Sequence, residues 1–267
     1  MSTTEDTTPD SAENHKAGRS SLFVGSIEKM FRILESFDTG VPSLSLTQIA
    51  AGSRINLSAT QRFVHTLQVL GYLRKDPQTR RYSLSPKLLN LGTSYLRTEE
   101  LARRATPYVR QAADSCGETT SLLELDGTDL IYIIRYGALR AVSTHILLGT
   151  RRPALLSAGG RIIVAFSPQE DAQLLIDQSY EKFGAELPER SELDESLAAA
   201  RRDGFSTVTT KGAAANVTLA APVLDAQHFA VASVEFTVSL DRWLDNGLRD
   251  SLMRLVLETT QALSSKT

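Results

Sequence analysis

The chain has 267 residues, of which 42% are hydrophobic and 22% charged, and its formal net charge at pH 7 is −2. This is the composition of a soluble globular protein of one or two domains, and no apolar run approaches the ~18–20 residues of a membrane-spanning helix, which excludes a membrane protein. Cys116 is the only cysteine, which excludes an internal disulfide and multi-cysteine metal sites and favours the cytoplasm.

Charge is distributed unevenly along the chain. Residues 1–20 are polar, lack an apolar core, and are expected to form a disordered tail rather than a secretory signal. Residues 20–97 carry ten Lys and Arg against four Asp and Glu, whereas residues 98–267 carry 17 against 23. A basic segment joined to an acidic one indicates an anionic partner for the first part alone, with a chance fluctuation as the alternative.

Residues 21–85 are predicted to contain three short helices. Ser26 is placed to cap the first, which runs to about Phe37. The core face of this helix is predicted to carry Ile27, Phe31 and Leu34.

Two capping boxes follow, each a serine with glutamine three residues later. Ser45 and Gln48 open a second helix that ends at Gly52, and Ser58 and Gln61 open a third that runs to Leu70. Gly71 stands where a left-handed C-cap belongs. The second and third helices therefore predict a helix-turn-helix.

A β-hairpin is predicted directly after the third helix, because Tyr and Leu alternate on both sides of an Asp-Pro-Gln-Thr turn at residues 76–79. A hairpin in this place is a wing. Arg80 and Arg81, together with Arg74 and Lys75, are expected to lie along phosphates or enter a minor groove.

The third helix has an apolar and a polar side. Its core positions are predicted to be Phe63, Val64, Leu67 and Leu70. Its candidate DNA contacts are Ser58, Thr60, Gln61, Arg62 and His65, side chains that donate hydrogen bonds to base edges or phosphates. The alternative is an ordinary solvated face, but neither Glu nor Lys occurs between Arg54 and Arg74.

A linker helix is expected over residues 86–104, because Leu88, Leu91, Tyr95 and Leu96 recur at helical spacing. Residues 105–267 then alternate predicted helices and strands, the strands falling near residues 119–125, 130–135, 141–147, 205–210, 217–223 and 229–238. Helices beside a mostly antiparallel sheet predict an α+β domain.

Nothing in this second part indicates catalysis. The stretch from Ser157 to Arg161 is not Gly-x-Ser-x-Gly, the four histidines show no metal-ligand spacing, and no phosphate-binding loop of the Gly-x-x-x-x-Gly-Lys type occurs. We therefore expect neither enzyme activity, nor a cofactor, nor a metal.

The sequence resembles the IclR family of bacterial transcriptional regulators over about residues 25–260. The resemblance rests on Gly25–Leu34, on Leu57–Arg62 followed by Leu67 and Leu70-Gly-Tyr72, and on Tyr82–Pro86 followed by Leu91-Gly92. It is strongest to the branch that controls aromatic-acid catabolism. It implies an N-terminal winged helix-turn-helix bound to a double-stranded DNA operator, a dimerising linker helix, a GAF-like or profilin-like effector-binding domain, and a dimer or dimer of dimers.

The same resemblance implies an effector pocket. The family's pocket positions correspond here to Leu155, Ser157, Thr218, Glu235 and Thr237. Strand alternation also places Ser233, Glu235 and Thr237 on one face, which is alternatively a solvent face.

Two departures from the family pattern bear on the effector. Leu155 stands where the branch usually has His, and a carboxylate such as Glu235 is rare in that strand. Glu235 would repel a carboxylate ligand unless Arg161 or Lys211 compensates, or unless it is protonated. This favours a neutral or hydroxyl-rich effector.

The sequence therefore predicts an effector-responsive, DNA-binding regulator of a catabolic operon. Two alternatives remain: a metabolite-binding enzyme with an appended helical domain, and a winged helix that binds protein rather than DNA.

Overall fold

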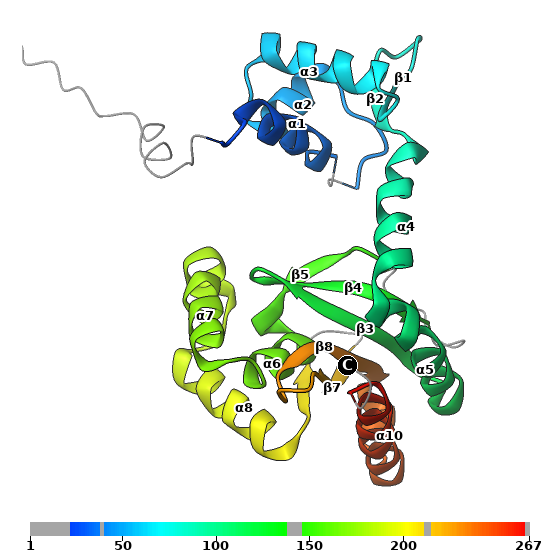
Figure 1. Cartoon of the computed structure of the whole chain (residues 1–267), viewed down its shortest axis with the longest axis vertical. Helices are drawn as coiled ribbons and strands as arrows, with labels where there is room; N and C mark the ends of the chain where they lie inside the picture. The colour runs from blue at the N-terminus through cyan, green and yellow to red at the C-terminus, as the bar shows by residue number, and fades with distance from the viewer. Residues whose placement is uncertain (1–21, 38–39, 138–145, 211–214, 265–267) are drawn as a thin grey trace, which may run out of the picture. The chain divides into compact units, whose positions relative to one another are not determined.

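The computed structural model describes residues 22–37, 40–137, 146–210 and 215–264 of the chain (Figure 1). The chain forms two compact units, Met1–Thr93 and Ser94–Thr267. The predicted tail over residues 1–20 and most of the predicted strand at residues 141–147 lie outside the described residues.

The first unit is a winged helix-turn-helix, which confirms the predicted fold. Its elements are α1 (Gly25–Glu35), α2 (Leu46–Ser53), α3 (Leu57–Val69), β1 (Leu73–Lys75), β2 (Tyr82–Leu84) and the 3₁₀ helix η1 (Pro86–Leu88). β1 and β2 pair in antiparallel fashion, and Leu44 forms an isolated bridge to Tyr82. The core packs the three helices against the hairpin through Ile33, Ile49, Val64, Leu67, Leu73 and Tyr82.

Helix α1 differs from its prediction. Val24 occupies the N-cap without a side-chain hydrogen bond, so Ser26 is not the cap. Ile27 and Phe31 are 51% and 49% exposed, whereas Ile33 is fully buried. Leu34, the third predicted core position, does pack against the core. It does so together with Met30, Ile33 and Phe37, which also recur at helical spacing.

The two predicted capping boxes have different outcomes. The Ser45 box is present: the Ser45 hydroxyl accepts from the Gln48 amide, and Gln48 Oε1 accepts from the Ser45 amide. The Ser58 box is wrong. Asn56 caps α3 instead, and its Oδ1 accepts the Ala59 amide at 2.8 Å. Asn is as good an N-cap as Ser, and the helix begins two residues earlier than the Ser58 box predicts.

The C-terminal end of α3 is partly as expected. Gly71 adopts the predicted left-handed conformation, with a φ of 80°. Leu70, predicted to face the core, is 47% exposed. The helix ends at Val69, and Leu70 is its C-cap.

The predicted single linker helix is two helices. α4 spans Leu89–Thr98, and Glu99 then caps α5 (Glu100–Cys116) by accepting the Leu101 amide. α5 crosses the expected boundary between residues 104 and 105 without a break, and Pro107 lies inside it. Leu101, Ala102 and Ala105 are already buried in the core of the second unit.

The second unit is an α+β domain with an entirely antiparallel sheet in the order β5-β4-β3-β8-β7-β6. Its strands are β3 (Thr119–Asp126), β4 (Asp129–Tyr136), β5 (Arg151–Pro153), β6 (Ser206–Thr209), β7 (Asn216–Leu224) and β8 (Ala230–Ser239). The short edge strand β5 was not predicted.

Helices cover both faces of this sheet (Figure 1). They are α6 (Ala158–Ala165), α7 (Gln169–Phe183), α8 (Arg190–Asp203), α9 (Leu240–Trp243) and α10 (Asn246–Ser264), with 3₁₀ turns η2 (Ala154–Leu156) and η3 (Gly184–Glu186). α5 and α10 pack on one face, around Val234 and Phe236. α6 packs on the other, around Leu130 and Tyr132.

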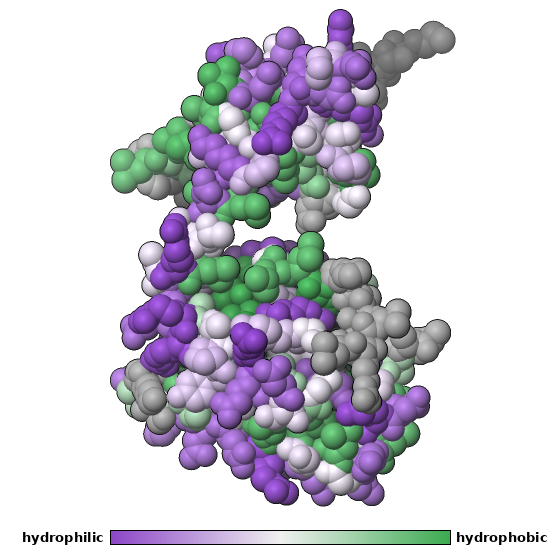
Figure 2. All heavy atoms as spheres, turned by 90° about the vertical axis from the view of Figure 1, so that its right-hand side faces the viewer, coloured by the Kyte–Doolittle hydropathy of each residue, from purple (hydrophilic) through white to green (hydrophobic). Residues whose placement is uncertain are grey.

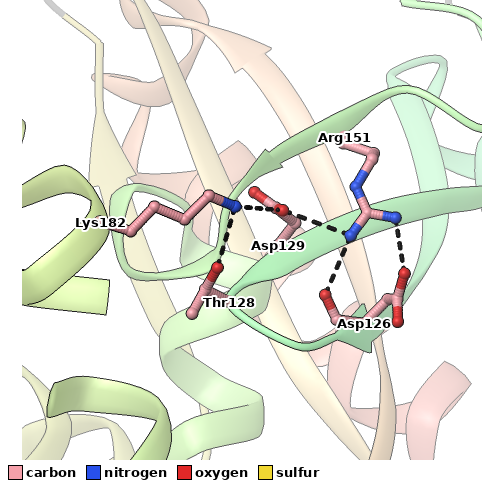
Figure 3. A network of polar contacts seen from close by, with 5 residues as sticks. All are labelled: Asp126, Thr128, Asp129, Arg151 and Lys182. Carbon is pink, nitrogen blue, oxygen red and sulfur yellow. Dashed lines mark hydrogen bonds and ion pairs between the residues drawn. The ribbon is translucent and has the colours of Figure 1, made fainter. Parts of the chain in front are cut away.

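A network of polar contacts joins α7 to the turn between β3 and β4 (Figure 3). Lys182 Nζ donates to Thr128 and to Asp129 Oδ2, at 3.2 and 2.9 Å. Arg151 binds Asp126 and Asp129 from β5. Each charged group in this network is paired with an opposite charge. The network therefore holds α7 and β5 to the β3–β4 turn and is not a candidate ligand site.

Candidate DNA-binding surface and effector site

Helix α3 presents a polar, acid-free surface. Ser58, Gln61, Arg62 and His65 are all exposed, and no Asp or Glu occurs between residues 54 and 75. Because Asn56 is the cap, the Gln61 side chain is not held in a capping box. Four of the predicted contacts on this helix therefore share one accessible surface whose donors match base edges and phosphates.

Thr60 does not belong to this surface. Its side chain is fully buried, and its hydroxyl lies within hydrogen-bonding distance of the carbonyl oxygens of Asn56 and Ile55, at 3.0 and 3.3 Å. This geometry does not fit the prediction that Thr60 contacts DNA, since the hydroxyl faces the preceding turn and the core.

The wing contains one exposed and one engaged arginine. Arg80 is exposed at the end of the turn, with a φ of 56°. Arg81 is partly buried and turns back to α2, donating to the carbonyl oxygen of Ser43 at 2.7 Å and to Gln48 Oε1 at 3.0 Å. The expectation that both reach DNA does not fit this geometry for Arg81, which fastens the wing to the capping box of α2.

The turn of the wing is held by Asp76. Its carboxylate accepts the amides of Gln78 and Thr79, at 2.8 and 3.1 Å. These backbone hydrogen bonds lower the pKa of Asp76 below its usual value. The carboxylate is thereby committed to the turn, and Arg74, Lys75 and Arg80 remain exposed as cations of the hairpin.

In the second unit, three of the five predicted effector residues, Thr218, Glu235 and Thr237, share the sheet face that α6 covers. Glu235 is 1% exposed and Ser233 is fully buried, so this face of β8 is not a solvent face. Register places Glu235 between Ser121 of β3 and Ala220 of β7. The next row across the sheet is Thr119, Thr237 and Thr218.

Glu235 lies directly under the start of α6. Its Oε2 accepts the backbone N–H of Gly159 at 3.2 Å. Burial raises the pKa of the carboxyl to about 7, while that hydrogen bond, the nearby Arg152 and Arg135 and a hydrogen bond from Tyr132 act in the opposite direction. Glu235 therefore exchanges a proton near neutral pH.

Two arginines, neither of them predicted, offset this carboxylate. Arg135 of β4 is half-buried and donates to the Ser121 hydroxyl at 3.2 Å. Arg152 of β5 is exposed and hydrogen bonds to Tyr132. Arg161, which the sequence offered as the compensating charge, instead donates to the Leu155 carbonyl oxygen at 2.8 Å; Lys211 lies outside the described residues.

The remaining predicted effector residues have unequal positions. Ser157 caps α6, its hydroxyl accepting the Gly160 amide and lying 3.0 Å from the Ala154 carbonyl oxygen. Thr218 and Thr237 are partly buried neighbours across β7 and β8. Leu155 is fully buried in a separate cluster with Val164, Ile176 and Leu193, so it lies among helices α6, α7 and α8 and lends no polar group to the Glu235 region.

The positions of these two arginines could not be predicted from strand periodicity. Tyr132 and Arg135 are three residues apart, so regular alternation would send them to opposite faces. A register shift between Leu122 and Leu123 pairs Leu123 with Tyr132 but Ser121 with Arg135. Both β4 residues thus reach the face of Glu235, a result that a strand-period argument does not predict.

One surface hollow of the second unit lies elsewhere. It measures about 620 Å³ and is lined by the β7–β8 turn and α10, with Asp225, His228 and Gln261 among its residues. None of the five predicted effector residues lines it. In the part of the chain that the structure describes, no three His, Cys, Asp or Glu side chains gather as a metal site, and no helix there has the length and apolar character to cross a membrane.

Comparison with known families agrees with both halves of this structure. The family model described as "Bacterial transcriptional regulator IclR C-terminal" matches residues 93–265, and the one described as "IclR helix-turn-helix domain" matches residues 26–77. The chain belongs to the IclR family. This IclR-family chain is accordingly a DNA-binding transcriptional regulator with a C-terminal effector-binding domain, not an enzyme.

Individual relatives point the same way. The chain is 27% identical over 244 residues to the Pca regulon regulatory protein of Pseudomonas putida, covering 90% of this chain and 83% of the relative. It is 24% identical over 256 residues to the p-hydroxybenzoate hydroxylase transcriptional activator of Acinetobacter baylyi, covering 92% of each. These names confirm the resemblance to regulators of aromatic-acid catabolism.

A solved structure shares the fold. The crystal structure of an IclR homolog complexed with 4-hydroxybenzoate, from Microbacterium hydrocarbonoxydans, has a TM-score of 0.70 and 20% sequence identity, covering 90% of this chain and 98% of that one. At this identity the likeness concerns the fold.

Proposed function

We propose that this regulator reads an operator in a catabolic gene cluster with the outer face of α3. Ser58, Gln61, Arg62 and His65 would contact base edges and flanking phosphates, and Arg80 of the wing would contact a phosphate. The observation that carries the proposal is the exposed, acid-free set of donors on α3, each with its side chain outside the core. A regulator of this kind acts where a bacterial chromosome is, in the cytoplasm.

The DNA-binding role is tested with sheared genomic DNA of the source organism at about 0.15 M salt. Purified full-length protein should retain a few fragments containing paired half-sites, and Arg62→Ala should lose them. Arg110→Ala is the matched control, because Arg110 is an exposed arginine of α5 in the second unit. Uniform retention of all fragments, or equal retention by the Arg62→Ala variant, would contradict base reading by α3.

We infer that the protein is a dimer or a dimer of dimers. Hydrophobic side chains are exposed on both units (Figure 2). In the first unit they include the start of α1, with Phe23, Ile27 and Phe31 each at least 47% exposed. Along α4, Leu89 and Leu91 are 68% and 57% exposed. Such surfaces are typical of subunit interfaces, and two recognition helices would match paired half-sites.

The effector site we propose lies on the α6-facing side of the sheet, around Glu235, Thr237 and Thr218. A negatively charged ligand is supported by the positive charges of Arg135 and Arg152, which act on the Glu235 carboxyl. A carboxylate would bind the arginines, and a hydroxyl group on the same ligand would donate to Glu235. The relative that holds 4-hydroxybenzoate supplies the first compound to try.

Thermal shift with 4-hydroxybenzoate and with 4-hydroxybenzamide tests the charge of the ligand. The two compounds share a ring and a hydroxyl group and differ in charge. Stabilisation by the acid, lost in Arg135→Gln and retained in the control Arg110→Gln, would support the site. Stabilisation by the amide alone would instead support the neutral effector that the sequence predicted.

A further inference from the structure

Leu57 is an exposed apolar residue at the start of the recognition helix. It is the first residue of α3 and is 49% exposed. It does not belong to the hydrophobic core of the first unit, to which α3 contributes Val64 and Leu67. The core of this unit therefore does not account for a leucine in this place.

Its neighbours on the helix are the candidate base-reading residues. Side chains four residues apart lie on the same face of a helix, which puts Leu57 beside Gln61, and Ser58 follows it directly. In helix-turn-helix proteins the N-terminal residues of the second helix are those that reach base edges. Leu57 thus occupies the end of α3 where a contact to a base is geometrically favoured.

An apolar side chain has one specific partner in the major groove. Thymine is the only base that presents a methyl group there, and apolar side chains recognise it by direct contact. A leucine offers nothing to a phosphate, which needs hydrogen-bond donors or positive charge. Single exposed apolar residues are common on protein surfaces, so exposure alone does not indicate a DNA contact. Val69, on the last turn of the same helix, is 71% exposed, and Leu57 differs from it by lying at the N-terminal end.

We propose that Leu57 specifies a thymine in each operator half-site by packing against its C5 methyl group. This rests on the proposed reading of DNA by α3 and adds a base preference to it. Ser58, Gln61 and Arg62 supply hydrogen bonds, whereas Leu57 supplies a contact that only thymine satisfies.

The test replaces thymines of a retained operator, one at a time, by deoxyuridine, which lacks only the methyl group. For the wild-type protein, each half-site should contain one thymine whose replacement weakens binding by about fourfold. This is the loss of affinity expected when one buried methyl group is removed. The same replacement should leave the affinity of Leu57→Ala unchanged. Leu57→Met, which keeps an apolar contact, should remain sensitive, as should Val69→Ala, the control on the same helix.

The outcomes separate this proposal from the one on which it rests. If the wild-type protein binds specific sites and no deoxyuridine replacement weakens it, Leu57 does not read thymine and the DNA-binding proposal stands. Equal sensitivity in wild type and Leu57→Ala likewise assigns the methyl contact to another residue. If the wild-type protein binds no specific site, the reading of DNA by α3 fails, and the role of Leu57 fails with it.

Discussion

The backbone N–H of Gly159 donates a hydrogen bond to Oε2 of Glu235 across 3.2 Å. This contact joins the first turn of α6 to the middle of β8, where the Glu235 side chain is buried. A helix N-terminus favours the ionised form of such a group, whereas burial favours the protonated form. Burial is the larger influence, and it raises the pKa to about 7.

The first prediction concerns stability against pH. The folded protein holds the Glu235 proton more tightly than the unfolded chain, whose carboxyl has a pKa of 4.5. Between these two pKa values the native state binds more protons, so the free energy of unfolding falls as pH rises, by up to about 3 kcal/mol in total. Glu235→Gln removes this contribution. The variant should gain stability relative to wild type between pH 5 and pH 8.

The chain allows this to be measured in the second unit alone. Its single tryptophan is Trp243, in α9, so urea unfolding followed by tryptophan fluorescence reports that unit. Wild type and Glu235→Gln are compared at several pH values. Parallel stability profiles would show that Glu235 keeps an ordinary pKa in the folded protein.

The second prediction concerns the close approach of α6 to its surroundings. A Cβ atom on Gly160 would lie 2.1 Å from the carbonyl oxygen of Ala154, and one on Gly159 would lie 2.8 Å from Ser233 Oγ. The first clash is with backbone and the second with a side chain that can rotate. Gly160→Ala should therefore destabilise the second unit more than Gly159→Ala, each by at least about 1–3 kcal/mol.

Gly92→Ala is the control for these substitutions, because a Cβ atom on Gly92 in α4 meets nothing within 4 Å. It should be neutral or slightly stabilising. Trp243 fluorescence again serves as the probe for the two α6 variants. Equal stability of Gly160→Ala and wild type would mean that α6 does not pack closely on η2.

The fold was largely predictable because capping and periodicity are local. Ser45 with Gln48, the position of Gly71 and the hairpin turn at Asp76 all appear in the structure as expected. Errors arose where two local solutions were equivalent. Asn56 and Ser58 are both good caps, and only tertiary packing, with Thr60 inside the core, decides between them.

The effector site was less predictable, for a different reason. Alternation correctly put Ser233, Glu235 and Thr237 on one face, but whether that face was buried depended on where α6 packs. Arg135 reached it through a register shift, and Arg152 through a three-residue edge strand too short to carry a periodic pattern. A register shift and the packing of a helix on a sheet each depend on two elements, so neither can be predicted from the pattern of one strand.

The third prediction separates the two arginines of the wing. Arg80→Ala should reduce the slope of log affinity against log salt by about 0.9, the value for one lost phosphate contact. Arg81→Ala should leave the slope nearly unchanged and lower the thermal stability of the first unit, because it removes hydrogen bonds to Ser43 and Gln48. Operator affinity is measured from about 0.05 to 0.3 M salt. A slope reduced equally by both variants would mean that Arg81 leaves Gln48 to bind DNA.

The fourth prediction concerns Lys87, which lies in η1 just before α4. Its ammonium group donates to the Leu70 carbonyl oxygen at 2.8 Å, at the C-terminus of α3, and lies 4.7 Å from the centre of the Tyr72 ring. A positive charge at a helix C-terminus and over an aromatic ring is favourable on both counts. Lys87 therefore fastens the start of the linker to the end of the recognition helix.

If that fastening carries the effector signal, Lys87→Met should uncouple the two functions. Effector affinity should match wild type, because the effector site lies in the second unit, while the ratio of operator affinities with and without effector should fall towards one. Lys75→Met is the control, since Lys75 is an exposed lysine of the wing that also lies over an aromatic ring, 5.4 Å from the centre of Tyr82. The Lys75→Met variant should bind the operator more weakly, but its ratio of operator affinities with and without effector should match wild type. An unchanged ratio in Lys87→Met would place the coupling elsewhere in the linker.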